Sequence, residues 1–192
     1  MSWLPSFRRV VSAFTFVVSA SVTLAQQETQ TGFAIDLQEA ERKLLQGDLT
    51  GARSAFEAIL DPEEEEAGAT KPPPEIVDRA RLGLFTIELR SGDYSKVRDE
   101  IAALPETFRT QRDVALVFAE AMARLGDYPG ALVVLQALAT KLPGDRQVQH
   151  EIGETLAKHG RRAAAFEVWR KNAEGNGPAD PVQLAYVGRS LW

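Results

Sequence analysis

The sequence contains no cysteine among its 192 residues. This absence excludes disulfide bonds, thiolate metal sites, c-type haem attachment and a cysteine nucleophile. It also excludes anchoring through a lipid-modified cysteine. Aromatic residues make up only 8% of the chain. Because no alternating run of valine, isoleucine or threonine is bounded by turn residues, the sequence does not predict β-strands.

Basic residues are too few for a nucleic-acid-binding surface. Lysine and arginine total 22 against 27 aspartates and glutamates, which gives a net charge of −5. Nucleic-acid binding requires a basic stripe, and adhesion to an anionic membrane surface requires a basic patch. We therefore expect neither nucleic acid nor a membrane surface as a partner.

Residues 1–25 have the pattern of a secretory signal peptide. Arg8 and Arg9 give a positive start, an apolar stretch follows over 10–24, and small residues precede a cut after Ala25. The apolar stretch is shorter than the roughly 20 residues that a membrane-spanning helix needs. We therefore favour cleavage, with a periplasmic or secreted product of net charge about −7. The alternative is an inner-membrane anchor formed by an uncleaved leader.

Residues 112–145 contain the unit around which the chain is organised. Small and apolar residues recur at helical spacing on both sides of a break at 126–129. Gly126 can adopt the left-handed conformation that ends a helix, and Pro129 suits the first turn of the next one. The Leu-Pro-Gly-Asp sequence at 142–145 ends the second helix. This segment is predicted to be a helical hairpin of 34 residues.

The same unit recurs along the chain at a fixed spacing. The glycine that ends its first helix stands at Gly47, Gly92, Gly126 and Gly160. The last three are 34 residues apart, and the first interval is longer by an 11-residue excess that falls within 61–75. A sustained period of 34 residues with two helices per period is typical of the tetratricopeptide repeat. The chain resembles this family over roughly residues 33–192.

Small and large side chains extend the resemblance when the glycine is numbered 15. Small residues occupy positions 8 and 20, where the two helices approach closely: Ala40, Ala119 and Gly153, then Ala52, Ala131 and Ala165. A large apolar residue at position 24 fills the gap to the next hairpin: Phe56, Ile101, Leu135 and Trp169. The second unit departs from the pattern, with Phe85 at position 8 and Val97 at position 20.

The resemblance implies an all-α fold, a right-handed α-solenoid of about four helical hairpins with a C-terminal capping helix. We expect the hairpins at about 36–60, 76–104, 112–142 and 146–174. A flexible segment at 26–35 would precede them, and a longer turn would occupy 105–111. The helix at 181–192 would cover the edge of the last hairpin; alternatively, it begins a truncated fifth repeat.

The insertion at 61–75 is acidic and rich in proline. Four like charges at 63–66 repel one another, and three prolines at 72–74 favour an extended chain. These features indicate a solvated linker between hairpins. The alternative is a docking segment for a basic or proline-recognising partner.

One string resembles a catalytic motif. His150 and Glu151 begin a His-Glu-x-x-His pattern, but Glu154 replaces the second histidine. His150 and Glu154, four residues apart, could share a helix face and a metal, but a catalytic zinc needs three protein ligands, and the chain cannot easily supply the third because His159 lies nine residues further on, across the turn at Gly160. The sequence also lacks a Gly-x-Ser-x-Gly elbow and a phosphate-binding glycine loop. We predict a non-catalytic protein without metal or cofactor; an enzyme with a hidden site is the alternative of another class.

The family resemblance implies that the first helix of each hairpin lines a concave groove, which binds a peptide or a partner's helix. Positions 2, 5, 9, 12 and 13 of the repeat face this groove. They are Arg79, Leu82, Thr86, Leu89 and Arg90 in the second unit, Asp113, Leu116, Glu120, Ala123 and Arg124 in the third, and Gln147, His150, Glu154, Ala157 and Lys158 in the fourth.

Position 13 is basic in three successive repeats, at Arg90, Arg124 and Lys158. Such a row suits the carboxylates of an acidic peptide or of a C-terminus. The simpler interpretation is that each cation complements its helix dipole, an effect of about 0.3–1 kcal/mol. His150 would either tune binding with pH or serve as a polar groove residue.

These observations predict a non-catalytic protein–protein interaction scaffold in the bacterial cell envelope, with an unidentified protein or peptide as partner. The alternative within the same class is the periplasmic arm of a larger outer-membrane export or assembly machine. The fold alone does not decide between these functions.

Overall fold

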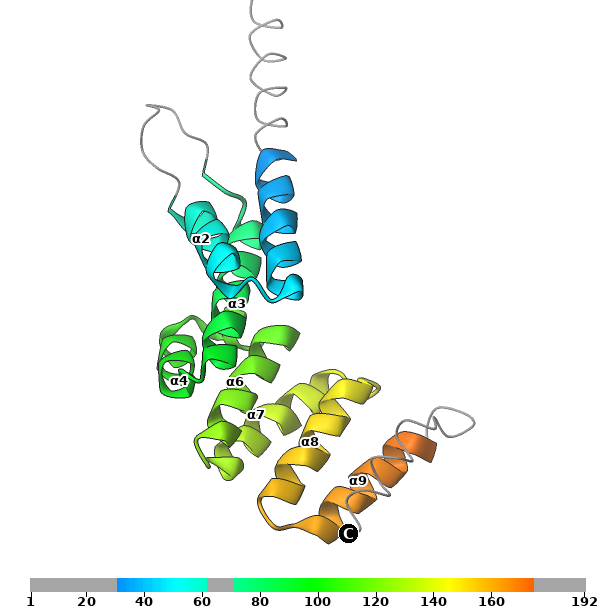
Figure 1. The fold of residues 1–192 in the computed structure, drawn as a ribbon. Coiled ribbons are helices and arrows are strands. Elements are labelled where there is room, and N and C mark those ends of the chain that lie inside the picture. The colour runs from blue at the N-terminus through cyan, green and yellow to red at the C-terminus, as the bar shows by residue number, and fades with distance from the viewer. Residues whose placement is uncertain (1–30, 62–70, 175–192) are drawn as a thin grey trace, which may run out of the picture. The chain divides into compact units, whose positions relative to one another are not determined.

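The computed structural model describes residues 31–61 and 71–174 (Figure 1). All regular secondary structure in these ranges is helical, so the prediction of an all-α fold built from helical hairpins is confirmed. Contacts divide the chain into two units, residues 1–84 and 85–192, and each is described by itself. The predicted signal peptide, the acidic run of the insertion and the capping helix at 181–192 lie outside the described residues.

The first unit contains a helix over residues 31–46, α2 (Leu49–Leu60) and the first half of α3 (Pro74–Ser91). Its buried side chains come from all three helices: Leu37, Ala40, Ala52, Phe56, Ile59 and Ala80. Phe56, which is fully buried, packs on Gly83 of α3, where an added Cβ would lie 2.3 Å from the Phe56 ring. The large residue at position 24 thus fills the space toward the next hairpin.

The first helix begins earlier than the sequence analysis expected. The segment 26–35 was predicted to be flexible, but the chain is already helical at residue 31. Phe33 precedes the buried Leu37 by four residues and is itself half-buried. Phe33 therefore extends the apolar stripe of the helix by one turn. Its burial stabilises the helix although the segment before it is polar.

The second unit contains the rest of α3 and six further helices among the described residues (Figure 1). They are α4 (Tyr94–Ala103), α5 (Glu106–Arg109), α6 (Arg112–Arg124), α7 (Tyr128–Lys141), α8 (Arg146–Lys158) and α9 (Arg162–Glu174). Each helix from α6 onward packs on the next, and α6 also contacts α4 and α8. Within this unit the hairpins therefore stack in chain order, as in an α-solenoid.

The core of the second unit joins α6, α7, α8 and α9. Its buried members are Ala115, Ala119, Ala131, Leu132, Leu135, Leu138, Val148, Ile152, Leu156, Ala165 and Trp169. The closest packing lies between Gly153 of α8 and Trp169 of α9, where an added Cβ would lie 2.1 Å from Nε1 of the indole. Glycine is therefore required at position 8 of this hairpin by the size of the side chain at position 24.

The glycine at position 15 has the same conformation in every hairpin. The φ angles are +83° at Gly47, +91° at Gly92, +85° at Gly126 and +81° at Gly160. Side chains other than glycine rarely adopt this region, which confirms the left-handed conformation expected at Gly126. The aspartate that follows caps the next helix in two of the hairpins: Asp48 accepts from the Gly51 N–H at 2.9 Å, and Asp127 from the Gly130 N–H at 3.0 Å.

The longer turn expected at 105–111 contains a single helical turn, α5. Leu104 is extended, at φ −80° and ψ 159°, because a residue that precedes proline is driven out of the helical region. Helix α4 therefore ends at Ala103. Burial of Phe108 then holds α5, a role that the hairpin pattern did not predict.

Candidate partner-binding groove

The predicted groove residues divide between the two units. Arg79 and Leu82 belong to the first unit, where Arg79 Nη2 donates to both carboxylate oxygens of Glu41, at 2.6 and 2.8 Å. Thr86, Leu89 and Arg90 lie on the part of α3 that belongs to the second unit. The remaining predicted residues lie on α6 and α8, so the candidate site is described within the second unit.

A cavity of about 290 Å³ lies between α6, α7 and α8, and we call it the α6–α8 pocket. Its lining residues are Leu116, Ala119, Glu120, Ala123, Arg124, Tyr128, Leu135, Glu151, Thr155 and Lys158. Half of them are predicted groove residues. The structure therefore brings together Leu116, Glu120, Ala123, Arg124 and Lys158, while Asp113, Gln147, His150, Glu154 and Ala157 do not line this pocket.

The two cations of the pocket are paired within their own helices. Arg124 Nη2 donates to Glu120 Oε1 at 3.1 Å, and Lys158 Nζ lies 3.6 Å from Glu154 Oε2. Both pairs have the glutamate four residues before the cation, which places the two side chains on one helix face. The hydrogen bond from Arg124 to Glu120 raises the pKa of the guanidinium. In the third and fourth hairpins the cation at position 13 is therefore compensated by the carboxylate at position 9.

The rings at the start of α4 and α7 add a second feature that repeats. The guanidinium of Arg124 lies over the Tyr94 ring, 5.9 Å from its centre. Tyr128, one period after Tyr94, lines the α6–α8 pocket, and its ring centre is 5.5 Å from that of His159. In both cases an aromatic ring from the second helix of one hairpin lies near the C-terminal end of the first helix of the next hairpin.

Glu151 lines the pocket although the sequence analysis did not place it in the groove. Its side chain is half-buried, and no described residue pairs with its carboxylate by a hydrogen bond or a salt bridge. Burial raises the pKa of Glu151; His150 and Lys158 oppose this rise, and Glu120 and Glu154 add to it. In the sequence, Glu151 is part of the His-Glu-x-x-His-like string, which suggests a metal ligand and not an unbalanced charge.

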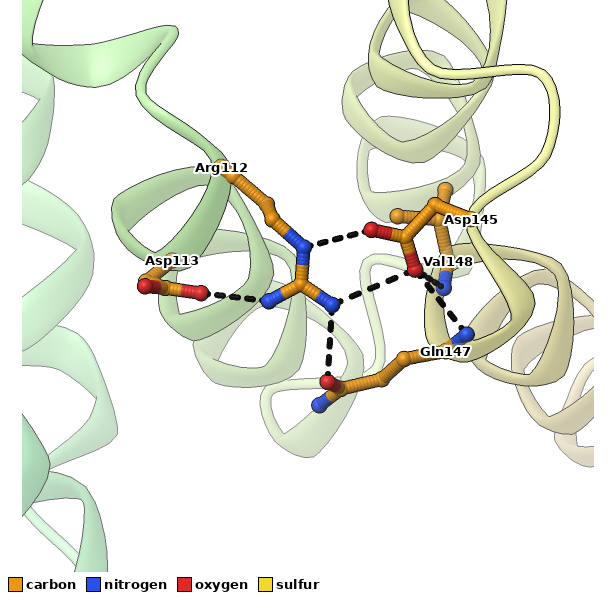
Figure 2. Close-up of polar contacts among 5 residues, drawn as sticks. All are labelled: Arg112, Asp113, Asp145, Gln147 and Val148. Carbon is orange, nitrogen blue, oxygen red and sulfur yellow. Dashed lines mark hydrogen bonds and ion pairs between the residues drawn. The ribbon is translucent and has the colours of Figure 1, made fainter.

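The N-terminal ends of α6 and α8 are joined by a second polar group, shown in Figure 2. Arg112 Nε donates to Asp145 Oδ2 at 2.5 Å, and Arg112 Nη2 donates to Asp145 Oδ1 at 3.2 Å. Asp145 also caps α8, because its Oδ1 accepts from the backbone N–H groups of Gln147 and Val148 at 3.0 and 3.1 Å. The hydrogen bond from Arg112 lowers the pKa of Asp145. One carboxylate therefore both caps a helix and binds the preceding hairpin.

Two predicted groove residues belong to this group. Arg112 also donates to Asp113 Oδ1 at 2.5 Å and to Gln147 Oε1 at 3.0 Å. We call the set of Arg112, Asp113, Asp145 and Gln147 the N-terminal clamp. The residues at position 2 of these two hairpins, Asp113 and Gln147, therefore make contacts within the chain.

His150 lies beside the core of the fourth hairpin. Its ring centre is 6.4 Å from that of Trp169, and its backbone carbonyl accepts from the indole N–H at 3.4 Å.

Among the residues that the structure describes, no group of three acidic or imidazole side chains could hold a metal ion. No helix in those ranges has both the length and the apolar character needed to cross a membrane.

Comparison with known proteins finds similarity to part of a much longer protein. A cellulose synthase operon protein C from Escherichia coli O157:H7 is 35% identical over 116 residues, and the protein of strain K12 is 34% identical over the same length. The matched segment covers 58% of this chain and 9% of each relative. No family model and no solved structure matches the sequence. The similarity and the helical hairpins are compatible with the tetratricopeptide-repeat resemblance.

Proposed function

We propose that this chain is a non-catalytic protein-interaction module that binds a peptide or a helix of a partner against α6 and α8. The observation that supports this proposal is the α6–α8 pocket, which five residues assigned to the groove by the repeat pattern help to line. Helices α6 and α8 both pack on α7 and touch each other at few points. A concave surface between them is therefore a consequence of the hairpin stacking.

We also propose that the module works in a complex for synthesis or export in the bacterial cell envelope. The similarity to cellulose synthase operon protein C over 116 residues supports this part of the proposal, as does the signal-peptide pattern of residues 1–25. The chain would act there as a scaffold, or as the periplasmic arm of a larger outer-membrane machine. N-terminal sequencing of the exported protein tests the location, with Gln26 expected as the first residue after cleavage.

Site-directed photo-crosslinking in living cells tests the binding surface. A photoreactive amino acid at Ala123 would lie in the pocket, whereas the same group at the exposed Gln136 of α7 would lie outside its lining. We expect an adduct with a defined envelope protein from position 123 alone, identified by mass spectrometry. Equal adducts from both positions, or none from position 123, would contradict the proposed groove.

A further inference from the structure

The lining of the α6–α8 pocket carries two carboxylates, Glu120 and Glu151, and two cations, Arg124 and Lys158, but Lys158 pairs with Glu154 just outside the lining. Glu120 pairs with Arg124 on α6, and Glu154 pairs with Lys158 on α8. Glu151 remains, and no described side chain forms a hydrogen bond or a salt bridge with it. We propose that this pocket receives an arginine or lysine side chain of the partner, with Glu151 as its counter-charge. This inference rests on the proposed function and specifies the chemistry of the partner.

The surroundings of Glu151 explain why a cation would bind there. The side chain is half-buried, and burial disfavours its charged form. A carboxylate that is partly removed from water and forms no hydrogen bond or salt bridge with a described residue gains from a charge-assisted hydrogen bond more than an exposed carboxylate does. The free energy lost by desolvating Glu151 is therefore recovered when a partner supplies a guanidinium or an ammonium group.

The shape of the pocket suits a long basic side chain. Leu116, Ala123 and Leu135 give the cavity an apolar wall, along which the methylene groups of arginine or lysine can pack. The Tyr128 ring lines the same cavity and can attract the cation through its π face. A volume of about 290 Å³ has room for one such side chain.

An acidic partner would meet less favourable electrostatics. To bind Arg124 and Lys158, its carboxylates would have to compete with Glu120 and Glu154, which already pair with these cations. They would also lie close to Glu151, where like charges repel. The observations thus favour a basic partner over the acidic peptide that the basic row suggested from the sequence alone.

NMR titration with small probes tests this inference on the ¹⁵N-labelled protein. n-Butylguanidinium carries the cation and an alkyl chain, and pentanoate carries a carboxylate on a chain of similar length. We expect butylguanidinium to shift the amide signals of residues 116–124 and 151–158 and pentanoate to leave them unchanged. Glu151→Gln should weaken butylguanidinium binding about tenfold. Glu57→Gln, on the exposed face of α2, is the matched control and should leave the affinity unchanged.

Other outcomes would overturn the inference. They are pentanoate binding at α6 and α8, equal affinity of Glu151→Gln and the unchanged protein for butylguanidinium, or the absence of any shift in these helices. Photo-crosslinking from position 123 separates this failure from that of the proposed function. If the adduct still forms in Glu151→Gln, the proposed groove stands, but the proposal that it binds a basic side chain through Glu151 is wrong. The absence of an adduct in the protein with intact Glu151 would overturn both.

Discussion

The two ends of α6 and α8 use charge in different ways. At the N-terminal ends, Arg112 and Asp145 are 33 residues apart in the sequence and join two hairpins. Toward the C-terminal ends, Glu120 pairs with Arg124 and Glu154 with Lys158, each within one helix. The first arrangement holds one hairpin to the next. The second leaves the space between the helices open as a pocket.

This difference indicates which charges serve the fold and which remain available for a partner. A side chain that bridges two hairpins cannot turn to a ligand without loosening the contact between them. A side chain paired along its own helix can exchange its partner at a cost of only a few tenths of a kcal/mol. We therefore expect substitutions in the N-terminal clamp to change stability and substitutions around the pocket to change binding.

The largest effect is expected from Asp145→Ala. This substitution removes the cap of α8 and the ion pair with Arg112 together. A lost cap costs about 1 kcal/mol, and a partly exposed bidentate ion pair adds up to about 1 kcal/mol. The free energy of unfolding, measured with urea, should fall by about 2 kcal/mol.

Asp127→Ala provides the matched control for this change, because Asp127 caps α7 through the Gly130 N–H and is not a member of the N-terminal clamp. We expect it to cost about 1 kcal/mol. Equal losses for the two variants would show that the contact between hairpins contributes nothing to stability, and the distinction between the two ends of the helices would fail.

Arg112→Gln should lower stability by about 1 kcal/mol near neutral pH and less in acid. Arg112 holds the pKa of Asp145 below its ordinary value. The stabilisation is therefore complete above the unfolded-state pKa of about 3.9 and is lost as the pH falls through the lower pKa of the folded state. Urea unfolding at several pH values should show the two proteins converging in acid; a constant difference would mean that Arg112 acts through packing alone.

Glu151→Gln should act in the opposite direction and more weakly. Burial raises the pKa of Glu151 in the folded protein. The protonated side chain therefore makes its full contribution to the free energy of unfolding below the unfolded-state pKa. This contribution is lost as the pH rises through the folded-state pKa and the buried carboxyl group ionises. The variant should be slightly more stable than the unchanged protein at pH 7 and equal to it well below pH 4. A loss of stability at pH 7 would instead indicate that Glu151 has a stabilising partner within the chain.

The smallest effect is expected from Glu154→Gln, which removes the pair with Lys158 within α8. Such pairs on an exposed helix face contribute about 0.2–0.5 kcal/mol, and salt screens them. Thermal unfolding at low and high salt should show this small loss at low salt only. A loss as large as that of Arg112→Gln would contradict the distinction between pairs within a helix and pairs between hairpins.

The sequence predicted the elements of this fold that repeat locally. The turn glycines follow from the 34-residue period. The small residues at positions 8 and 20 and the large residue at position 24 are what the family resemblance implies, and the buried Ala52, Ala131 and Ala165 agree with it. The early start of the first helix and the short α5 were missed. Both depend on the burial of one aromatic side chain, Phe33 or Phe108, and a repeat pattern does not contain that information.

The candidate site was only partly predictable. The pairs of Glu120 with Arg124 and Glu154 with Lys158 were visible as a spacing of four residues, so the charge balance of these two cations could have been inferred. The role of Glu151 depends on how far α8 is rotated against α6, which periodicity does not fix. For the same reason the assignment of groove residues remains a prediction that binding experiments must test.

The packing of Gly153 against Trp169 also restricts how this sequence can diverge. With the indole in place, even one added methyl group at position 153 would lie 2.1 Å from a ring nitrogen. We therefore expect residues 153 and 169 to change together. Replacing the tryptophan first opens room for alanine at 153, whereas the reverse order passes through a clashing intermediate. Homologous sequences should accordingly show the smaller residue at 169 wherever 153 has lost its glycine.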